Sequence, residues 1–178
     1  ITLIQAILLF LFAGAISYWL FEKKKTGLQI GLAIIVCFFF LRGFSFWQTG
    51  RQKKIIIYNL PQHRAIDFIN GRNFLFSGDS DLITNDFARN FHLNPSRTLQ
   101  RIKASASLHD LVSYNNYVSF GTKKILLLDN TISLKPSGTK YPIDLIVVSK
   151  NPKIYISRLN SSFAIKQIVF DGSVPAGK

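Results

Sequence analysis

Residues 143–149 read Ile-Asp-Leu-Ile-Val-Val-Ser, and this stretch determines how the second half of the chain is built. A nearly continuous run of branched apolar residues is typical of a strand whose two faces are both covered. Residues 152–159 have the pattern of a helix, and residues 165–170 form a further apolar run. The order strand, helix, strand predicts a parallel βαβ unit with a right-handed crossover.

The residues before this unit alternate between strand and helix patterns. Asn70-Gly71-Arg72 is a hairpin turn signal between two short apolar runs. Apolar residues recur at helical spacing from Leu82 to Leu93, with Ser80 or Asp81 as the expected cap, and Asn94-Pro95 is expected to separate this helix from a second one at 96–104. Predicted strands cover residues 55–58, 65–69, 73–76, 112–115, 117–120, 124–129 and 131–134. We therefore expect a mixed α/β domain over residues 51–178.

The first 50 residues have the composition of a membrane hairpin. Ile1 to Phe21 contains no charged residue, and a second apolar stretch is interrupted only by Arg42. About 20 apolar residues at about 1.5 Å rise each span the hydrocarbon core. We expect transmembrane helices at about 2–21 and 27–47, with Gly27 and Gly31 allowing close approach to each other or to further helices. A signal peptide is the alternative, but the stretch lacks a basic leading region and is followed by three lysines.

The charged and aromatic residues around these spans predict how they sit in the bilayer. Interfacial anchors are expected at Trp19, Lys23, Lys24, Lys25, Arg42 and Trp47. An intramembrane cation facing a polar path is the other interpretation of Arg42. The Lys23–Lys25 cluster favours a cytoplasmic turn, which places the domain after residue 50 on the extracytoplasmic side, although Arg51, Lys53 and Lys54 weigh against this. Because the chain lacks Met, we expect it to be a piece of a longer polypeptide.

The soluble half is strongly basic. The chain has 22 Lys and Arg against 9 Asp and Glu. The first 50 residues hold four of the basic and one of the acidic residues, which leaves an excess of +10 after residue 50. Such a charge attracts phosphate polyanions or anionic lipid headgroups, or serves only solubility. Single-stranded DNA contacts are predicted at Arg64, Arg72, Lys123 and Lys124, where aromatic residues are interleaved; core packing of those rings is the alternative. The single Cys37 excludes an intramolecular disulfide and a multi-cysteine zinc site.

This succession resembles the metallo-β-lactamase-like domain that ends ComEC-type competence proteins. The resemblance rests on residues 58–65, on Asn70-Gly71, on residues 74–78 and on Asp144 to Ser149, which matches the first half of a strand that carries metal ligands in the family. It implies a truncated αββα sandwich, incomplete at its C-terminus, behind the last two membrane spans. It also implies a multi-pass inner-membrane channel for DNA uptake, with single-stranded DNA, lipid, the parent channel's remaining helices and other competence proteins as partners.

The sequence departs from that family at the metal motif. After Ser149 the chain continues Lys150-Asn151-Pro152-Lys153, where the resemblance calls for His, His, Asp and His. Ser149, Lys150 and Lys153 therefore mark a degenerate site, and we expect no catalytic residue, no metal and no cofactor, because lysines would repel metal cations. His63, His92 and His109 are scattered along the chain. The alternatives are phosphate binding by the two lysines, a membrane-tethered metallohydrolase or nuclease with a non-standard site, and a two-span adaptor without enzymatic activity.

Overall fold

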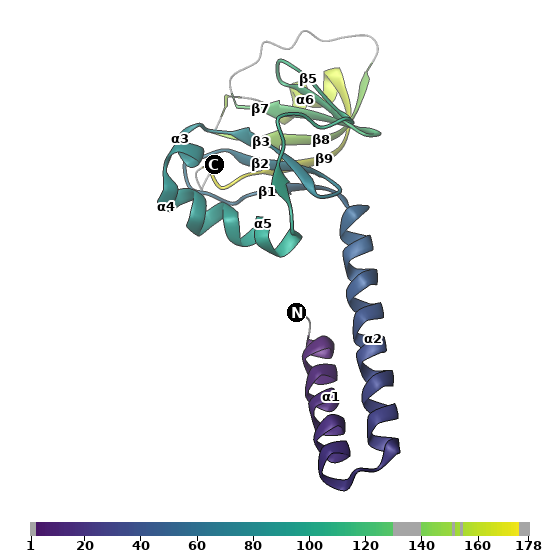
Figure 1. Ribbon diagram of the computed structural model, residues 1–178. Helices are drawn as coiled ribbons and strands as arrows, with labels where there is room; N and C mark the ends of the chain where they lie inside the picture. The colour runs from purple at the N-terminus through teal and green to yellow at the C-terminus, as the bar shows by residue number, and fades with distance from the viewer. Residues whose placement is uncertain (1–2, 130–139, 151, 154, 175–178) are drawn as a thin grey trace. The chain divides into compact units, whose positions relative to one another are not determined.

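The computed structural model describes residues 3–129, 140–150, 152–153 and 155–174. The chain divides into two compact units, Ile1–Arg51 and Gln52–Lys178. The first consists of helices and the second contains two β-sheets flanked by short helices (Figure 1). Two apolar helices followed by a mixed α/β domain confirm the coarser form of the predicted fold class.

The helical unit is a hairpin of α1 (Leu3–Glu22) and α2 (Lys25–Gly50). Both helices are long and apolar enough to cross a membrane. Gly27 lets the helices approach closely, because a Cβ atom there would lie 3.1 Å from the Trp19 backbone nitrogen. Gly31 faces Ile16 in the same way, so the two glycines pack against α1. α2 runs three residues further than the predicted span and ends at Gly50.

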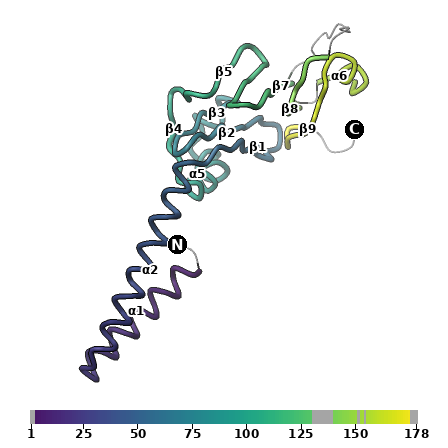
Figure 2. The backbone as a smooth tube through the Cα atoms, turned by 90° about the vertical axis from the view of Figure 1, so that its right-hand side faces the viewer, coloured from purple at the N-terminus to yellow at the C-terminus, as the bar shows by residue number. Residues whose placement is uncertain are grey.

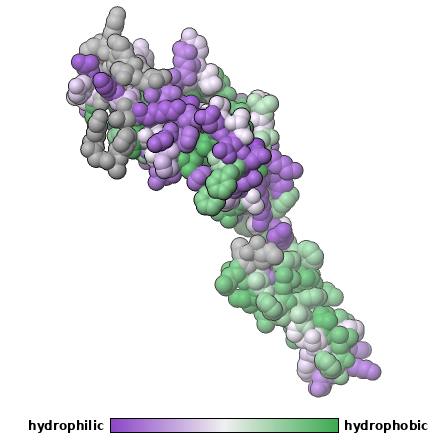
Figure 3. Space-filling model, turned by 90° about the vertical axis from the view of Figure 1, so that its left-hand side faces the viewer, coloured by the Kyte–Doolittle hydropathy of each residue, from purple (hydrophilic) through white to green (hydrophobic). Residues whose placement is uncertain are grey.

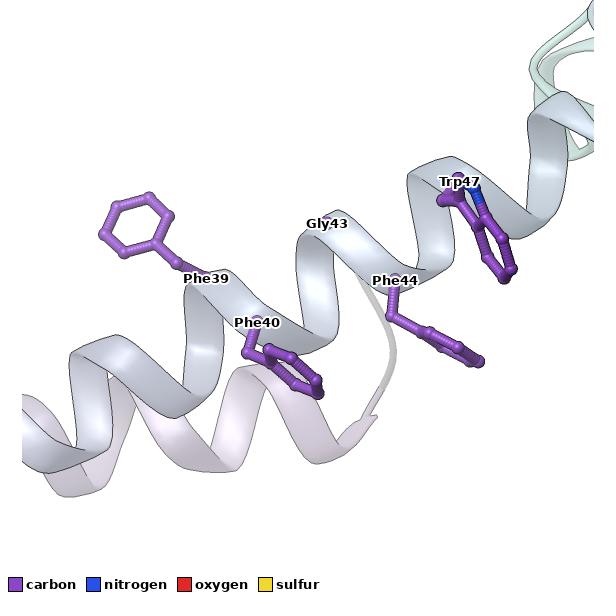
Figure 4. Close-up of a pocket in the computed structure, with 5 residues that line it drawn as sticks. All are labelled: Phe39, Phe40, Gly43, Phe44 and Trp47. Atoms are coloured by element: carbon purple, nitrogen blue, oxygen red, sulfur yellow. The ribbon is translucent and has the colours of Figure 1, made fainter.

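The C-terminal half of α2 carries an apolar groove (Figure 4). Phe39, Phe40, Gly43, Phe44 and Trp47 line it. Figure 4 shows the rings of Phe40, Phe44 and Trp47 projecting from one side of the helix, while Phe39 projects elsewhere. The groove has no titratable side chain, and its residues have the composition of a lipid-facing surface.

The second unit is built from nine described strands and five short helical segments. The strands are β1 (Lys53–Ile57), β2 (Ala65–Asn70), β3 (Asn73–Gly78), β4 (Lys103–Ala104), β5 (Leu111–Tyr114), β6 (Tyr117–Phe120), β7 (Lys123–Leu128), β8 (Tyr141–Val148) and β9 (Phe163–Phe170). The helical segments are α3 (Asp81–Thr84), α4 (Asp86–Ala88), the π-helical turn η1 (Arg89–Leu93), α5 (Asn94–Gln100) and α6 (Ile156–Ser162).

The strands form one sheet in the order β1-β2-β3-β4 and a second in the order β5-β6-β7-β8-β9. In the first sheet β2 pairs antiparallel with β1 and β3, and the predicted hairpin turn is present with Gly71 at a φ of 60°. In the second sheet β7, β8 and β9 are parallel neighbours. The predicted βαβ unit is therefore present as β8, α6 and β9.

The two sheets pack face to face around one apolar core. Phe68 of β2 meets Phe120 of β6 with ring centroids 5.6 Å apart, and Leu127 and Val147 belong to the same buried cluster. The far face of the second sheet is covered by Leu159 of α6, and Leu93 of η1 packs on the far face of the first. Each fully buried large side chain contributes about 1.5–3 kcal/mol. The result is four layers in the order helix, sheet, sheet, helix (Figures 1 and 2).

Several local predictions need correction. Ser80 precedes α3 without a side-chain cap, and Asn85 caps α4 instead by accepting hydrogen bonds from two backbone N–H groups. Asn94-Pro95 does not separate two helices, because Pro95 lies in the first turn of α5, where a missing N–H costs nothing. Residues 103–104 form β4 and not the end of a helix, and α6 begins at Ile156 and not at 152. The predicted strand 131–134 lies outside the described residues.

Candidate functional site

The candidate site lies where parallel strands end. The carboxyl ends of β7, β8 and β9 share one edge of the second sheet, which is where α/β proteins place their ligands. Polar side chains follow each of these strands, and residues after β3 and before β2 join them. We call this set the carboxyl-edge cluster: His63, Arg64, Asp79, Asp129, Ser149, Lys150, Asp171 and Ser173.

Asp171 is the buried centre of one half of the cluster. The hydroxyl of Ser149 donates to Asp171 Oδ2 at 2.5 Å, and the Ser173 hydroxyl donates to Asp171 Oδ1. The Ser173 backbone N–H also donates to Asp171 Oδ1 at 3.0 Å. Gly172 lets this turn lie against the loop between β1 and β2, because a Cβ atom at position 172 would lie 2.2 Å from Asn59 Oδ1. Both oxygens of this carboxylate are thus occupied by hydroxyl and amide donors.

Asp79 is the centre of the other half. Lys150 Nζ donates to Asp79 Oδ1 at 2.6 Å, and the Arg64 backbone N–H donates to Asp79 Oδ2 at 3.1 Å. His63 Nδ1 lies 3.6 Å from Asp79 Oδ2. Lys150 adopts a φ of 58°, which is uncommon for a residue with a side chain, and its backbone N–H donates to Ser173 Oγ at 2.7 Å. Lys150 therefore joins the Asp79 and Asp171 halves.

Arg64 and Asp129 form a third contact at this edge. Arg64 Nη1 donates to Asp129 Oδ2 at 2.7 Å, and both side chains are mostly buried. Within the described part of the chain, Arg64 Nε and Asp129 Oδ1 are buried without a hydrogen-bond partner. The pair links the entry to β2 with the end of β7, so it connects the two sheets.

These residues do not fit the two-metal centre that the family resemblance implies. In the described ranges, no three His, Cys, Asp or Glu side chains gather as a metal site requires. A two-metal centre needs several imidazole and carboxylate ligands that are open to the cations. At this edge Asp79 accepts from an ammonium group, and Asp171 accepts from two hydroxyl groups.

The structure separates the residues predicted to contact DNA. Arg64 lies at the carboxyl edge, bound to Asp129, whereas Arg72 lies in the β2–β3 turn and Lys123 and Lys124 begin β7. The turn and the start of β7 are at the opposite end of the strands. There Lys53 Nζ donates to the Asp110 carboxylate at 2.6 Å, and the Gly121 N–H donates to the Asp110 backbone carbonyl oxygen. Lys153 is exposed in the segment between β8 and α6. The DNA contacts and the role of Lys153 stay predictions.

The predicted membrane anchors other than Arg42 lie at or near the ends of the helices. Lys24 pairs with Glu22 at 3.4 Å, and the Arg51 guanidinium lies 4.1 Å from the centre of the Trp47 ring. Trp19 sits beside Gly27 in the helix contact, and Arg42 is exposed within α2.

A buried ion pair on the outer face of the first sheet escaped sequence reasoning. Asp67 of β2 is fully buried and receives Arg97 Nε and Nη2 at 2.9 Å each. The Tyr58 hydroxyl donates to Asp67 Oδ2 at 2.8 Å, and burial followed by this hydrogen bond raises the pKa of Tyr58 to about 12. The sequence signal for this pair was one acidic residue, Asp67, inside an apolar strand. Its partner Arg97 could be identified only after the position of α5 on the sheet was known.

Lys150→Met is expected to raise the pKa of Asp79. Burial disfavours the charged carboxylate, but the hydrogen bonds from Lys150 and Arg64 outweigh it and lower the pKa of Asp79 below its usual value. A lowered pKa stabilises the fold above the unfolded value of about 4, and that stabilisation is lost as the pH falls through the folded value. The pair is half-exposed, so its loss costs about 1 kcal/mol or less near pH 7.

The titration of Asp79 can be followed by NMR of its carboxyl carbon. Lys166→Met is the matched control, because Lys166 Nζ lies 2.6 Å from Asp144 Oδ1 in a separate pair. We expect Lys150→Met alone to shift the Asp79 titration upward. An unchanged Asp79 titration in Lys150→Met would show that Lys150 does not hold this carboxylate.

Comparison with known proteins confirms the resemblance to ComEC-type proteins. Residues 55–178 match the family model of the ComEC C-terminal domain. This range covers nearly all of the second unit and more than half of the chain. No match was found among curated proteins or among solved structures.

Proposed function

Because the chain belongs to the ComEC family, we propose that it forms part of an inner-membrane channel that takes up single-stranded DNA during natural transformation. Family membership indicates a part in competence DNA uptake, and together with the two apolar helices it indicates a membrane protein. In the proposal α1 and α2 are two spans of a multi-pass channel. The soluble domain lies on the extracytoplasmic side and meets the channel's other helices and further competence proteins.

The soluble domain, in this proposal, is a metal-free relative of metallo-β-lactamase-like hydrolases that guides DNA or stabilises the channel. Two packed sheets with helices on both outer faces support the relationship, as does a polar cluster at the carboxyl ends of β7, β8 and β9. The observation that carries the loss of metal is the 2.6 Å contact between Lys150 Nζ and Asp79 Oδ1. A protein ammonium group supplies the positive charge that this carboxylate needs.

The charge of the domain supports a role with DNA. After residue 50 the chain carries 18 basic against 8 acidic residues. Several acidic side chains are already bound to cations, including Asp67, Asp79, Asp129 and Asp144. Phosphate groups of a nucleic acid would be attracted to the remaining positive charge.

A combined metal and cleavage assay tests the loss of hydrolase activity. The full chain, reconstituted in nanodiscs, is analysed for bound metal and then incubated with labelled single-stranded DNA and added Mn²⁺ or Zn²⁺. We expect no stoichiometric metal and intact DNA, with chelator-treated chain as the control. Stoichiometric metal together with cleavage that the chelator abolishes would overturn the proposal in favour of a metallohydrolase.

A further inference from the structure

The segment from α3 to α5 exposes a series of apolar side chains on the surface of the domain. Ile83, Phe87, Phe91, Pro95 and Leu99 follow one another at every fourth position, and all five are exposed. The exposed fractions are 45% for Ile83, 74% for Phe87, 67% for Phe91 and 78% for Leu99. Figure 3 views the side of the domain on which α3, α4 and α5 lie, and it shows a hydrophobic patch bordered by hydrophilic surface. We call these five residues the apolar stripe.

Buried residues of the same segment orient the apolar stripe toward the surface. Leu82, Leu93 and Arg97 point inward and are buried, which fixes the opposite face outward. The π-helical turn at Arg89–Leu93 widens the helix at this point. Phe87 and Phe91 lie with ring centroids 5.7 Å apart and nearly parallel at 7°. Exposed large apolar side chains gathered on one surface of a basic domain mark an interaction site.

One end of the stripe is tied to the point where the chain leaves the apolar helices. Gln52 Nε2 donates to the Gln100 carbonyl oxygen at 2.9 Å, and Lys54 Nζ donates to Gln100 Oε1 at 2.7 Å. Gln100 directly follows Leu99, the last residue of the stripe. α2 ends at Gly50, so Arg51 alone separates the end of that helix from Gln52, and the two Cα–Cα steps extend about 7 Å at most.

The charges near the stripe favour a lipid surface over a polyanion. Along the stripe, Arg89 is paired with Asp86 and Arg97 is buried against Asp67, so few cations remain to hold phosphates beside the stacked rings. Exposed cations instead gather at the end next to Gln52, where Arg101 and Lys103 lie. Aromatic and aliphatic residues with cations at one margin are the composition of an interfacial helix, which seats its apolar face at the headgroup boundary.

We propose that the apolar stripe rests on the surface of the lipid bilayer that α2 enters, with Arg101 and Lys103 at the level of anionic headgroups. The occupant of the stripe is lipid, and the contact holds this face of the soluble domain against the bilayer. This inference does not depend on the domain binding DNA or lacking a metal.

The test uses an environment-sensitive label on the full chain. Phe91 is replaced by Cys in a Cys37→Ser background, labelled with the fluorophore NBD, and reconstituted in vesicles of phosphatidylethanolamine and phosphatidylglycerol. Tyr114→Cys in the same background is the matched control, because Tyr114 is an aromatic residue of β5 that is 77% exposed. Both variants remove exposed rings, so both are expected to fold.

We expect a blue-shifted emission for the label at position 91 and its quenching by spin-labelled lipids, with neither effect at position 114. Water-like emission without lipid quenching at position 91 would overturn the proposal. A blue shift without lipid quenching would also overturn it, because the stripe would then be covered by protein. Quenching relieved by a single-stranded oligonucleotide, or a response to the oligonucleotide alone, would reassign the stripe to base stacking.

Discussion

Arg97→Met is expected to lower the free energy of unfolding of the soluble domain by about 3–5 kcal/mol, because it leaves a buried carboxylate without its counter-charge. Asp67 is fully buried, and after the change its described hydrogen-bond donor is the Tyr58 hydroxyl alone. The same change removes the guanidinium from the face of Phe74, whose ring centre it approaches to 4.2 Å. The change thus removes the contacts that Arg97 of α5 makes with β2 and β3.

Urea unfolding followed by pulse proteolysis of the full chain in micelles measures this change. Arg89→Met is the matched control, because Arg89 pairs with Asp86 at the surface, where a pair contributes about 0–1 kcal/mol. The double variant Asp67→Leu, Arg97→Met should be less destabilised than Arg97→Met, since it buries no unpaired charge. Equal unfolding free energies for Arg97→Met and Arg89→Met would contradict the buried role of Arg97.

Much of the second unit follows from its apolar pattern. The run at Ile143–Val148 predicts a strand covered on both faces, and the structure places Val147 in the core between the sheets and Ile146 beneath α6. Asn70-Gly71 predicts the hairpin because few residues other than Gly adopt a positive φ there. Strand existence was predictable wherever the residues repeat a clear pattern, whereas helix ends were not, as Asn85 and Pro95 show.

The candidate site was only partly predictable, because it is assembled from distant segments. The sequence pointed to Ser149 and Lys150 through the missing metal motif. It gave no reason to pair Lys150 with Asp79, which lies 71 positions away, or Arg64 with Asp129, 65 positions away. Such partners are defined by the order in which strands join a sheet, and that order is a property of the tertiary fold. The Asp67–Arg97 pair was missed for the same reason.

Affinity for single-stranded DNA is expected to fall steeply with salt concentration. Arg64 is bound to Asp129, so three cation–phosphate contacts remain, as predicted for Arg72, Lys123 and Lys124. They correspond to a log–log slope of about −2 at about 0.7 per phosphate, or about a twenty-fold loss between 50 and 200 mM salt. Lys123 and Lys124 are both exposed at the start of β7. Replacing them together by Gln should reduce the slope by about 1.4.

Arg89→Gln is the control for this series, because Arg89 is paired with Asp86 and lies outside the predicted contacts. Its slope should equal that of the unchanged chain. A slope lowered equally by Arg89→Gln and by the double Gln variant would show that net charge alone, without located contacts, sets the affinity.

The most direct test is therefore the binding of labelled single-stranded DNA to the full chain in phosphatidylcholine nanodiscs, over a salt series and with bound metal assayed on the same sample. The account predicts binding at low salt, a linear fall in log affinity with log salt, and no stoichiometric metal. Absence of binding at low salt would contradict the DNA role and leave a two-span adaptor as the function of this chain.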